Sequence, residues 1–311
     1  MRNLIAFTRN EIRAMSKEYA GDNAIRPLEK LMNDFCRSKG YDTNQVFTDF
    51  LDYLIWLFNP AGGKIDGWKY SSDESKKFFE MAGTYLKIMA QQTQELGWYD
   101  AFGDLFMALH PSGNGKGQFF TPPSVCNMVA ACNMRGANLE EYETRTPFGK
   151  RICINDPAAG SSRLILAGNK VLLEMMKNDL HYDDIKIAVN RPYLVAEDLD
   201  YNCVKMSAIN IMVHGCFGEA VCHDTLCEPE AVRAGYIINE SMWPFPTNVP
   251  SIRMEMRPER FVCTSRMIAI RKAKEAQKEA PPPPDKQEPP KPELTEATMR
   301  KKKEYKQLEL W

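Results

Sequence analysis

The feature that most constrains this chain is a regular alternation of short apolar segments with longer periodic ones between residues 151 and 224. The short segments are RICIND, YLVAED and EAVCHD, and they are separated by LILAGNKVLLEMMKN and NCVKMSAINIMVHG. The longer segments repeat apolar residues at three- and four-residue steps, which is typical of helices. Strand, helix, strand, helix, strand is the pattern of a parallel sheet with crossover helices. The sequence therefore predicts an α/β fold.

A helical domain is expected to precede this sheet. PLEKLMNDFCRS, VFTDFLDYLIWLF and ESKKFFEMAGTYLKIMAQQTQEL all carry helical periodicity. From residue 272 proline and charged residues dominate, and few apolar residues remain to offset the entropy of ordering. We therefore expect a helical domain at 1–110, an α/β domain at 111–271 and a flexible tail at 272–311. One more strand is expected within RFVCTSRMIAIRK.

Charge and cysteine content limit the environment in which the protein works. The 40 Lys and Arg residues nearly balance the 41 Asp and Glu residues, so any basic surface for nucleic acid must be local. No stretch approaches the roughly 20 apolar residues of a membrane span, and the N-terminus lacks the apolar core of a signal peptide. The 9 cysteines have no regular spacing. We expect a reduced, cytoplasmic protein without a membrane partner.

A zinc site is the alternative interpretation of one short segment, which contains His214, Cys216, Cys222, His223 and Cys227. No C-x-x-C pair occurs there, although such a pair is usual in structural zinc sites. The expected strand would also send Cys222 and His223 to opposite faces of the sheet. We therefore expect small core residues and a surface histidine, and no metal.

An acid closes each of the three expected strands, at Asp156, Asp198 and Asp224. Parallel strands present their carboxyl ends at one edge of a sheet, so these acids are expected to line one crevice. The turn DPAAGSSRL follows the first acid, and its Gly160 tolerates positive φ and a close ligand. The amino end of the next helix attracts an anion such as a carboxylate.

This arrangement of acids and turn suits S-adenosylmethionine (SAM). The turn would hold an α-carboxylate, the second acid the hydroxyls of a ribose, and the third an exocyclic amine of adenine. A dinucleotide is disfavoured because G-x-G-x-x-G is absent and Asp156 would repel a pyrophosphate. The remaining alternative is that the three acids are ordinary strand-end residues.

Further motifs strengthen the case for SAM. DAFGDLFMAL, GKGQFFTPPSVCNMV, DPAAGSSRLILA, AEDLDYNCVKMSAINIMVHG and CHDTL resemble the successive motifs of adenine-N6 DNA methyltransferases. The resemblance covers residues 98–227, is strongest to the methylation subunit of type I restriction–modification systems, and extends to that family's helical domain. It implies a Rossmann-like, SAM-dependent methyltransferase sheet with DNA as partner, and leaves open a specificity subunit as a further partner.

The resemblance also implies a set of cofactor-binding residues: Gln118, Phe119, Thr121, Pro122, Asp156, Pro157, Ala158, Gly160, Asp198 and Asp224. The GQFFTP residues would line the methionine end of SAM. Asp198 would hold the ribose, with Glu197 as the alternative one residue earlier, and Asp224 would meet the adenine. Core packing is the alternative for Phe119 and Phe120. The chain departs from the family at Ser162 and Arg163, where a glycine-rich turn is usual.

The family's catalytic motif, N-P-P-F or D-P-P-Y, does not occur in this sequence. In the family it grips the amino group of the target adenine and stacks on the flipped base. The corresponding region offers Asn239, Pro244 and Phe245 at a wider spacing, and these are the catalytic candidates. Either the active site is rearranged, or the domain binds SAM or DNA without catalysis. A SAM-dependent enzyme with a non-DNA substrate is a further alternative.

Two other segments bear on partners. Several basic residues could contact DNA phosphates or simply form a solvated face: Arg253, Arg257, Arg260, Arg266, Arg271, Lys272 and Lys274. The terminal QLELW resembles the peptide by which bacterial proteins bind the replication sliding clamp. The anchors would be Gln307, Leu308, Leu310 and Trp311. The alternative is a helix end that packs on the protein itself.

Overall fold

The computed structural model describes residues 24–109, 120–139, 143–146, 149–226, 234–240 and 250–263. The chain divides into two compact units, Met1–Ala269 and Ile270–Trp311, and all the described residues belong to the first. The expected clamp-binding peptide and the expected flexible tail lie outside the described residues. They stay predictions, as does the expected domain boundary at residue 110.

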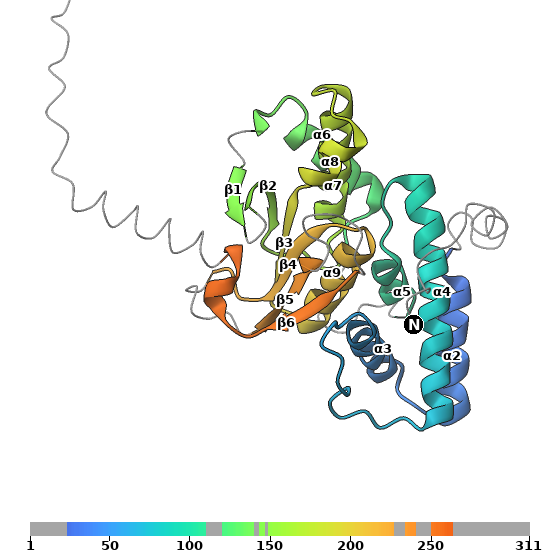
Figure 1. Ribbon diagram of the computed structural model, residues 1–311. Coiled ribbons are helices and arrows are strands. Elements are labelled where there is room, and N and C mark those ends of the chain that lie inside the picture. Colours follow the sequence, from blue (N-terminus) through green and yellow to red (C-terminus); the bar gives the residue numbers. More distant parts are fainter. Residues whose placement is uncertain are drawn as a thin grey trace, which may run out of the picture. The chain divides into compact units, whose positions relative to one another are not determined.

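The described helices are α2 (Arg26–Lys39), α3 (Thr43–Leu57), α4 (Ser72–Leu96), α5 (Ala101–Leu109), α6 (Pro123–Met134), α7 (Arg163–Asn178), α8 (Asp184–Val189) and α9 (Tyr201–Val213). The described strands are β1 (Glu143–Thr146), β2 (Gly149–Asp156), β3 (Tyr193–Asp198), β4 (Phe217–Cys222), β5 (Ala234–Ile238) and β6 (Ile252–Glu255). A short 3-10 helix, Pro258–Arg260, follows β6. Figure 1 shows the helices α2 to α5 gathered beside the sheet.

Local signals set the ends of the N-terminal helices. The Asp42 side chain accepts a hydrogen bond from the Gln45 amide at the start of α3. Ser71 and Glu74 form a capping box at the start of α4, which satisfies two backbone donors that no helical carbonyl can reach. Gly97 ends α4 in the left-handed conformation, with φ of 82°. These helices confirm the interpretation of the periodic N-terminal segments.

The six strands form one sheet in the order β1-β2-β3-β4-β5-β6. The strands β2, β3 and β4 run parallel, and Asp156 pairs with Ala196 while Asp198 pairs with Cys222. Their carboxyl ends therefore lie at the same edge, which we call the carboxyl edge. This confirms the predicted α/β fold and places the three strand-end acids near one another along the sheet.

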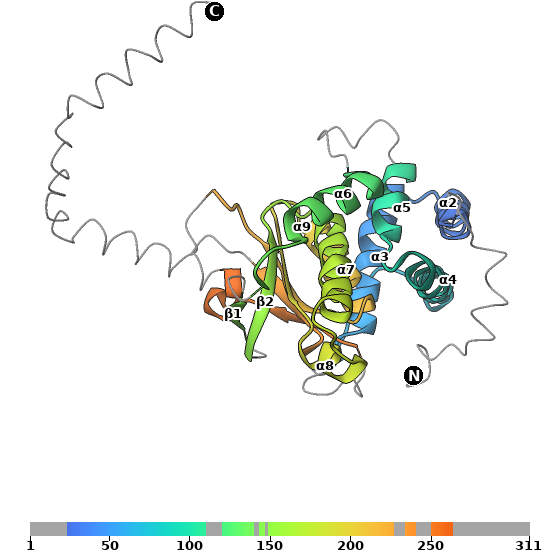
Figure 2. The ribbon, with the colours of Figure 1, turned by 90° about the horizontal axis from the view of Figure 1, so that it is seen from above.

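The helical segment and the sheet share one hydrophobic core. Figure 2 shows α7 and α9 between the sheet and the helices α2 to α5. One continuous cluster of buried side chains includes Phe50 and Phe102 from the helical segment, Ile209 from α9 and Tyr236 from β5. The Lys205 ammonium on α9 also pairs with the Asp52 carboxylate on α3 at 2.6 Å. The sheet is thus held by the helices that precede it.

The opposite face of the sheet is packed by residues that follow the 3-10 helix. Phe261, Val262 and Cys263 form a cluster with side chains of β3, β4 and β5. RFVCTSRMIAIRK was expected to form a strand, but Pro258–Arg260 is a 3-10 helix, and Val262 and Cys263 are helical. In its described part that prediction is wrong.

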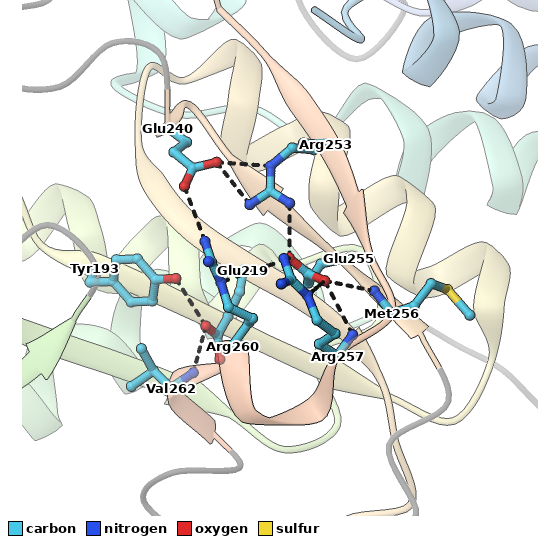
Figure 3. Close-up of polar contacts among 9 residues, drawn as sticks. All are labelled: Tyr193, Glu219, Glu240, Arg253, Glu255, Met256, Arg257, Arg260 and Val262. Atoms are coloured by element: carbon cyan, nitrogen blue, oxygen red, sulfur yellow. Dashed lines mark hydrogen bonds and ion pairs between the residues drawn. The ribbon is translucent and has the colours of Figure 1, made fainter. Parts of the chain in front are cut away.

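A buried carboxylate fixes this segment on the sheet. Glu219 on β4 has no exposed surface, and it accepts hydrogen bonds from the amides of Val262 and Cys263 at 2.8 Å. The Tyr193 hydroxyl also donates to it at 2.9 Å (Figure 3). Amides at a helix start have no helical carbonyl to bond, so they suit a carboxylate, and this explains why an acid is tolerated inside the sheet.

Three short antiparallel strands were not predicted. The strand β1 has only 4 residues, ETRT, and β6 has only 4, IRME, so neither shows a clear apolar alternation. The strand β5 is more apolar, but its segment was interpreted as the surroundings of the catalytic motif. Among the described residues, no helix is long and apolar enough to cross a membrane.

We predict that Glu219 makes the stability of the protein depend on pH. Burial raises the pKa of its carboxyl from 4.5 to about 7. The folded state therefore holds the proton more tightly than the unfolded state, and the corresponding stability is present below pH 4.5 and lost as the pH rises through 7. The loss amounts to about 3 kcal/mol.

Urea unfolding at pH 5 and pH 8 of the wild type and Glu219→Gln measures this effect. Glutamine has nothing to titrate, so we expect the variant to lose about 2.5 kcal/mol less stability than the wild type between the two pH values. Equal losses in the two proteins would contradict the prediction.

Candidate functional site

The turn after β2 is held in shape by its own polar groups. The Asp156 carboxylate accepts a hydrogen bond from the Ala158 amide at 3.0 Å. Gly160 has φ of 56°, in the region that favours glycine. The Ser207 hydroxyl of α9 donates to the Gly160 carbonyl at 2.9 Å. The predicted turn residues Asp156, Pro157, Ala158 and Gly160 therefore lie together at the carboxyl edge.

Asp198, at the end of β3, faces this turn. One carboxylate oxygen accepts from the Gly160 amide at 2.9 Å, and the other accepts from the Asp200 amide at 2.8 Å. Glu197 instead contacts the buried His223, with 3.0 Å between Glu197 Oε2 and His223 Nδ1. Successive side chains of a strand point to opposite faces, so only one of the two acids can meet the turn, and it is Asp198.

Asp224 follows β4 and belongs to the same edge. The His223 amide donates to the Asp198 carbonyl at 3.0 Å, which ties the ends of β3 and β4 together. The Asp224 carboxylate accepts from the Leu226 amide at 3.1 Å and is partly exposed. The three predicted acids are therefore brought to one edge. The strand β3, which ends at Asp198, lies between β2 and β4.

Burial shifts the proton affinity of two of these acids. Desolvation raises the pKa of the Asp156 carboxyl and of the Asp198 carboxyl above their usual values. For Asp198 the amides of Asp200 and Gly160 oppose this shift because they favour the ionised form. Such carboxylates are stabilised by a ligand that brings positive charge or hydrogen-bond donors, and they repel a phosphate.

The segment before α6 contributes a residue that the sequence did not single out for cofactor binding. The Phe120 ring lies so close to Gly160 that a Cβ on the glycine would be 3.0 Å from it. Phe120 also contacts Phe106 edge to face, with 5.3 Å between ring centroids. Thr121 and Pro122 lead into α6, where Pro122 is the N-cap residue. Gln118 and Phe119 lie outside the described residues.

Asp100 is a second residue that sequence reasoning missed. It is 3% exposed and accepts four hydrogen bonds, from Gly103 N, Ser161 Oγ, Arg163 Nε and Asn210 Nδ2, at 2.9, 2.5, 2.6 and 2.8 Å. The donors come from α5, the turn, α7 and α9. The available signal was an acid directly before a periodic segment, which is typical of a helix cap.

The two departures from the family turn have structural consequences. Ser162 adopts φ of 76° although it is not glycine, and among the described residues its buried hydroxyl has no hydrogen-bond partner. Arg163 is the first residue of α7, and its side chain is 7% exposed. The arginine extends toward α5 and pairs there with Asp100 and Asp104, each at 2.6 Å.

The catalytic candidate Asn239 does not lie with the acids. The neighbouring Ile238 pairs with Gly218 near the amino end of β4, so Asn239 sits at the opposite edge of the sheet. It has no exposed surface, and its amide group donates to the carbonyls of Met212 and Cys216 at 3.2 and 2.7 Å. Its side-chain oxygen accepts from the Ser251 amide. Pro244 and Phe245 lie outside the described residues.

Three members of the cysteine and histidine segment are buried in the structure: Cys216, Cys222 and His223. No group of three or more potential ligands that could hold a metal occurs among the described residues, and Cys227 is not one of them. Cys216 and Cys222 are buried, as expected. His223 is also buried, at 2% exposure, so the expectation of a surface histidine is wrong. Its pairing with Glu197 explains why it is tolerated inside.

The basic residues after β5 are already engaged by acids. Arg253 contacts Glu240 at 2.8 Å and Glu255 at 2.9 Å, and Arg257 contacts Glu255 at 2.8 Å (Figure 3). Arg260 lies within 3.8 Å of both glutamates. Hydrogen bonds from Arg257 and Arg253 hold the pKa of Glu255 well below its usual value. These ion pairs favour the interpretation that Arg253, Arg257 and Arg260 form a solvated charged face. The other basic candidates lie outside the described residues: Arg266, Arg271, Lys272 and Lys274.

Comparison with known proteins identifies a family that matches part of the chain. Residues 99–245 match the family model of the N-6 DNA methylases. No curated protein and no solved structure matches the chain significantly. The matched range begins two residues before α5 and one residue before Asp100, and it includes the turn and the three strand-end acids.

We predict that the contact between Gly160 and Phe120 makes Gly160 more sensitive to substitution than a comparable glycine. Gly136 is the matched control, because it has φ of 79° and nothing within 4 Å of an added Cβ. Gly136→Ala should cost about 1 kcal/mol of stability from backbone strain alone. Gly160→Ala should cost about 2–3 kcal/mol because the ring or the turn must also move.

Urea unfolding of both variants, and of Gly160→Ala combined with Phe120→Leu, measures the excess. With leucine in place of Phe120, Gly160→Ala should lose little more stability than Gly136→Ala does. Equal losses at Gly160 and Gly136 would show that the ring does not press on the turn.

Proposed function

Residues 99–245 belong to the N-6 DNA methylase family, and from that premise we propose that this protein transfers a methyl group from SAM to the N6 amino group of adenine in DNA. The observation that carries the proposal is the hydrogen bond from the Gly160 amide to the Asp198 carboxylate. It closes the turn after β2 against the end of β3, and it orients the acid that would hold the ribose.

The residues at the carboxyl edge fit SAM by charge. Gly160 lets the Phe120 ring pack directly against the turn, because a Cβ at this position would lie 3.0 Å from the ring. The edge carries Asp156, Asp198 and Asp224, whereas SAM carries a positive sulfonium and an ammonium group. The negative charge of the edge would therefore attract the cofactor.

Each part of the site would have a separate task. Asp156, Pro157, Ala158 and Gly160 would surround the methionine end, together with Gln118, Phe119, Thr121 and Pro122. Asp198 would accept hydrogen bonds from the ribose hydroxyls, because a carboxylate oxygen retains acceptor capacity beyond its one amide bond. Asp224 would accept from the exocyclic amine of the cofactor's adenine. When bound, SAM supplies an activated methyl group, so the protein's contribution is chiefly positioning.

The finer relationship to type I methylation subunits is also part of the proposal. It rests on the helices α2 to α5, whose core continues into the methylase sheet. A specificity subunit would then be a partner, and the sliding clamp would be a further one through the terminal QLELW. A SAM-dependent reaction on a substrate other than DNA is the less supported alternative, because the matched family modifies DNA.

A second candidate function is a SAM-binding module without catalysis. One observation favours it: Asn239 is committed to backbone hydrogen bonds at the edge opposite Asp198. The sequence contains no N-P-P-F or D-P-P-Y tetrad elsewhere. SAM binding and methyl transfer must therefore be measured separately.

We predict that the purified protein incorporates labelled methyl groups from SAM into the N6 position of adenine in DNA. The assay is run with and without the proteins encoded beside it, because a specificity subunit would supply target choice. Methylated adenine in the digested DNA supports the enzyme. SAM binding without incorporation under either condition would favour the binding module, and the absence of SAM binding would contradict both.

We predict that Asp198→Ala weakens SAM binding about 10- to 100-fold, since a hydrogen bond to a charged group contributes about 1.5–3 kcal/mol. Glu197→Gln is the matched control. It is buried on the neighbouring position of β3 but contacts His223 rather than the turn. Calorimetry should show its affinity within about twofold of the wild type. Equal weakening in both variants would move the ribose contact away from Asp198.

A further inference from the structure

Arg163 joins three parts of the molecule at the start of α7. Its Nε and Nη2 atoms donate to Asp100 and Asp104 at 2.6 Å each. Its Nη1 atom donates to the Thr121 carbonyl at 3.3 Å. The guanidinium carbon also lies 5.8 Å from the centroid of the Phe120 ring. One side chain therefore contacts α5 and the segment that leads into α6.

The charges around Arg163 explain why it stays ionised inside the protein. Burial disfavours its charged form, but Asp100 and Asp104 outweigh this effect and raise the pKa of the guanidinium. Desolvation also raises the pKa of the Asp104 carboxyl, although Arg163 opposes that shift. A buried charge that loses its partner costs several kcal/mol, so the three groups hold one another in place.

The contacts of Arg163 lead directly to the proposed cofactor site. The Phe120 ring beside the guanidinium is the group that lies against Gly160. The Thr121 carbonyl belongs to the segment proposed to line the methionine end of SAM. Ser161, two residues before Arg163, donates to the same Asp100 oxygen at 2.5 Å. The buried pair of Asp100 and Arg163 therefore contacts both the turn and the segment beside it.

The planar fork of the guanidinium is required for this arrangement. Its separate nitrogens donate in fixed directions to Asp100, Asp104 and the Thr121 carbonyl. Lysine carries a single ammonium on a flexible stem, so it keeps the charge but loses the three-way geometry. Gly103 lies against the guanidinium, and a Cβ there would be 2.6 Å from Arg163 Nη2. The guanidinium is therefore packed closely enough to be held in a single orientation.

We propose that Arg163 is a positioning residue for the cofactor site: it holds Phe120 and Thr121 against the Gly160 turn by fixing them to Asp100 and Asp104. The inference rests on the proposed SAM site, and it adds Arg163, the first residue of α7, to the residues that shape that site. Arg163 acts through its neighbours. The helices before the methylase sheet thereby determine the shape of the cofactor site.

The test compares Arg163→Lys with Lys205→Met. Lys205 is the matched control, because it is a buried cation that joins α9 to Asp52 on α3 without touching the turn. We expect both variants to lower the melting temperature. Only Arg163→Lys should raise the Kd and KM for SAM, by about tenfold or more, while kcat at saturating SAM changes less than about threefold.

A second readout does not need SAM. Amide hydrogen exchange should accelerate in residues 120–126 and 157–162 of Arg163→Lys and stay unchanged there in Lys205→Met. A wild-type protein that does not bind SAM would overturn the proposed function, and the inference about positioning would then be decided by exchange alone. Wild-type exchange rates and wild-type SAM affinity in Arg163→Lys would overturn the inference.

Discussion

The buried carboxylate of Asp100 is the interaction on which the rest of the structure depends. A carboxylate inside a protein is tolerated only when donors replace the water that it has lost. Here the donors come from α5, the turn after β2, the start of α7 and α9, through Gly103, Ser161, Arg163 and Asn210. None of these elements can move without leaving the charge unsatisfied. The geometry of the turn is therefore fixed by a residue that precedes the sheet.

Much of the fold could be predicted because its main signals are local. Helical periodicity located α2 to α4, α7 and α9, and short apolar runs located the three parallel strands. The topology of a parallel sheet then placed Asp156, Asp198 and Asp224 at one edge. The strands β1 and β6 were missed because 4 residues of mixed polarity carry no usable period. The 3-10 helix at Pro258–Arg260 was missed because its apolar neighbours pack on the sheet face.

The rest of the site could not be predicted because it depends on contacts between distant residues. When only the turn is considered, Ser162 and Arg163 are departures from a glycine-rich pattern and have no evident role. Arg163 meets an acid 63 positions earlier in the chain, and no local pattern identifies which acid that is. The same limit applies to Asn239. Its residue type suggested catalysis. Its hydrogen bonds show instead that the side chain joins the end of β5 to Met212 on α9 and to Ser251, just before β6.

The separation of the two sheet edges constrains where chemistry can take place. The acids, the turn and Phe120 lie at the carboxyl edge, and Asn239 lies at the other. If the protein methylates adenine as proposed, the group that grips the base beside SAM would lie near the carboxyl ends of β2, β3 and β4 and not beside Asn239. Removing the Asn239 side chain would break three buried hydrogen bonds, so lost activity in such a variant would report unfolding as readily as catalysis. Loss of catalysis can be told apart from unfolding only if methyl transfer is measured per folded, SAM-bound molecule.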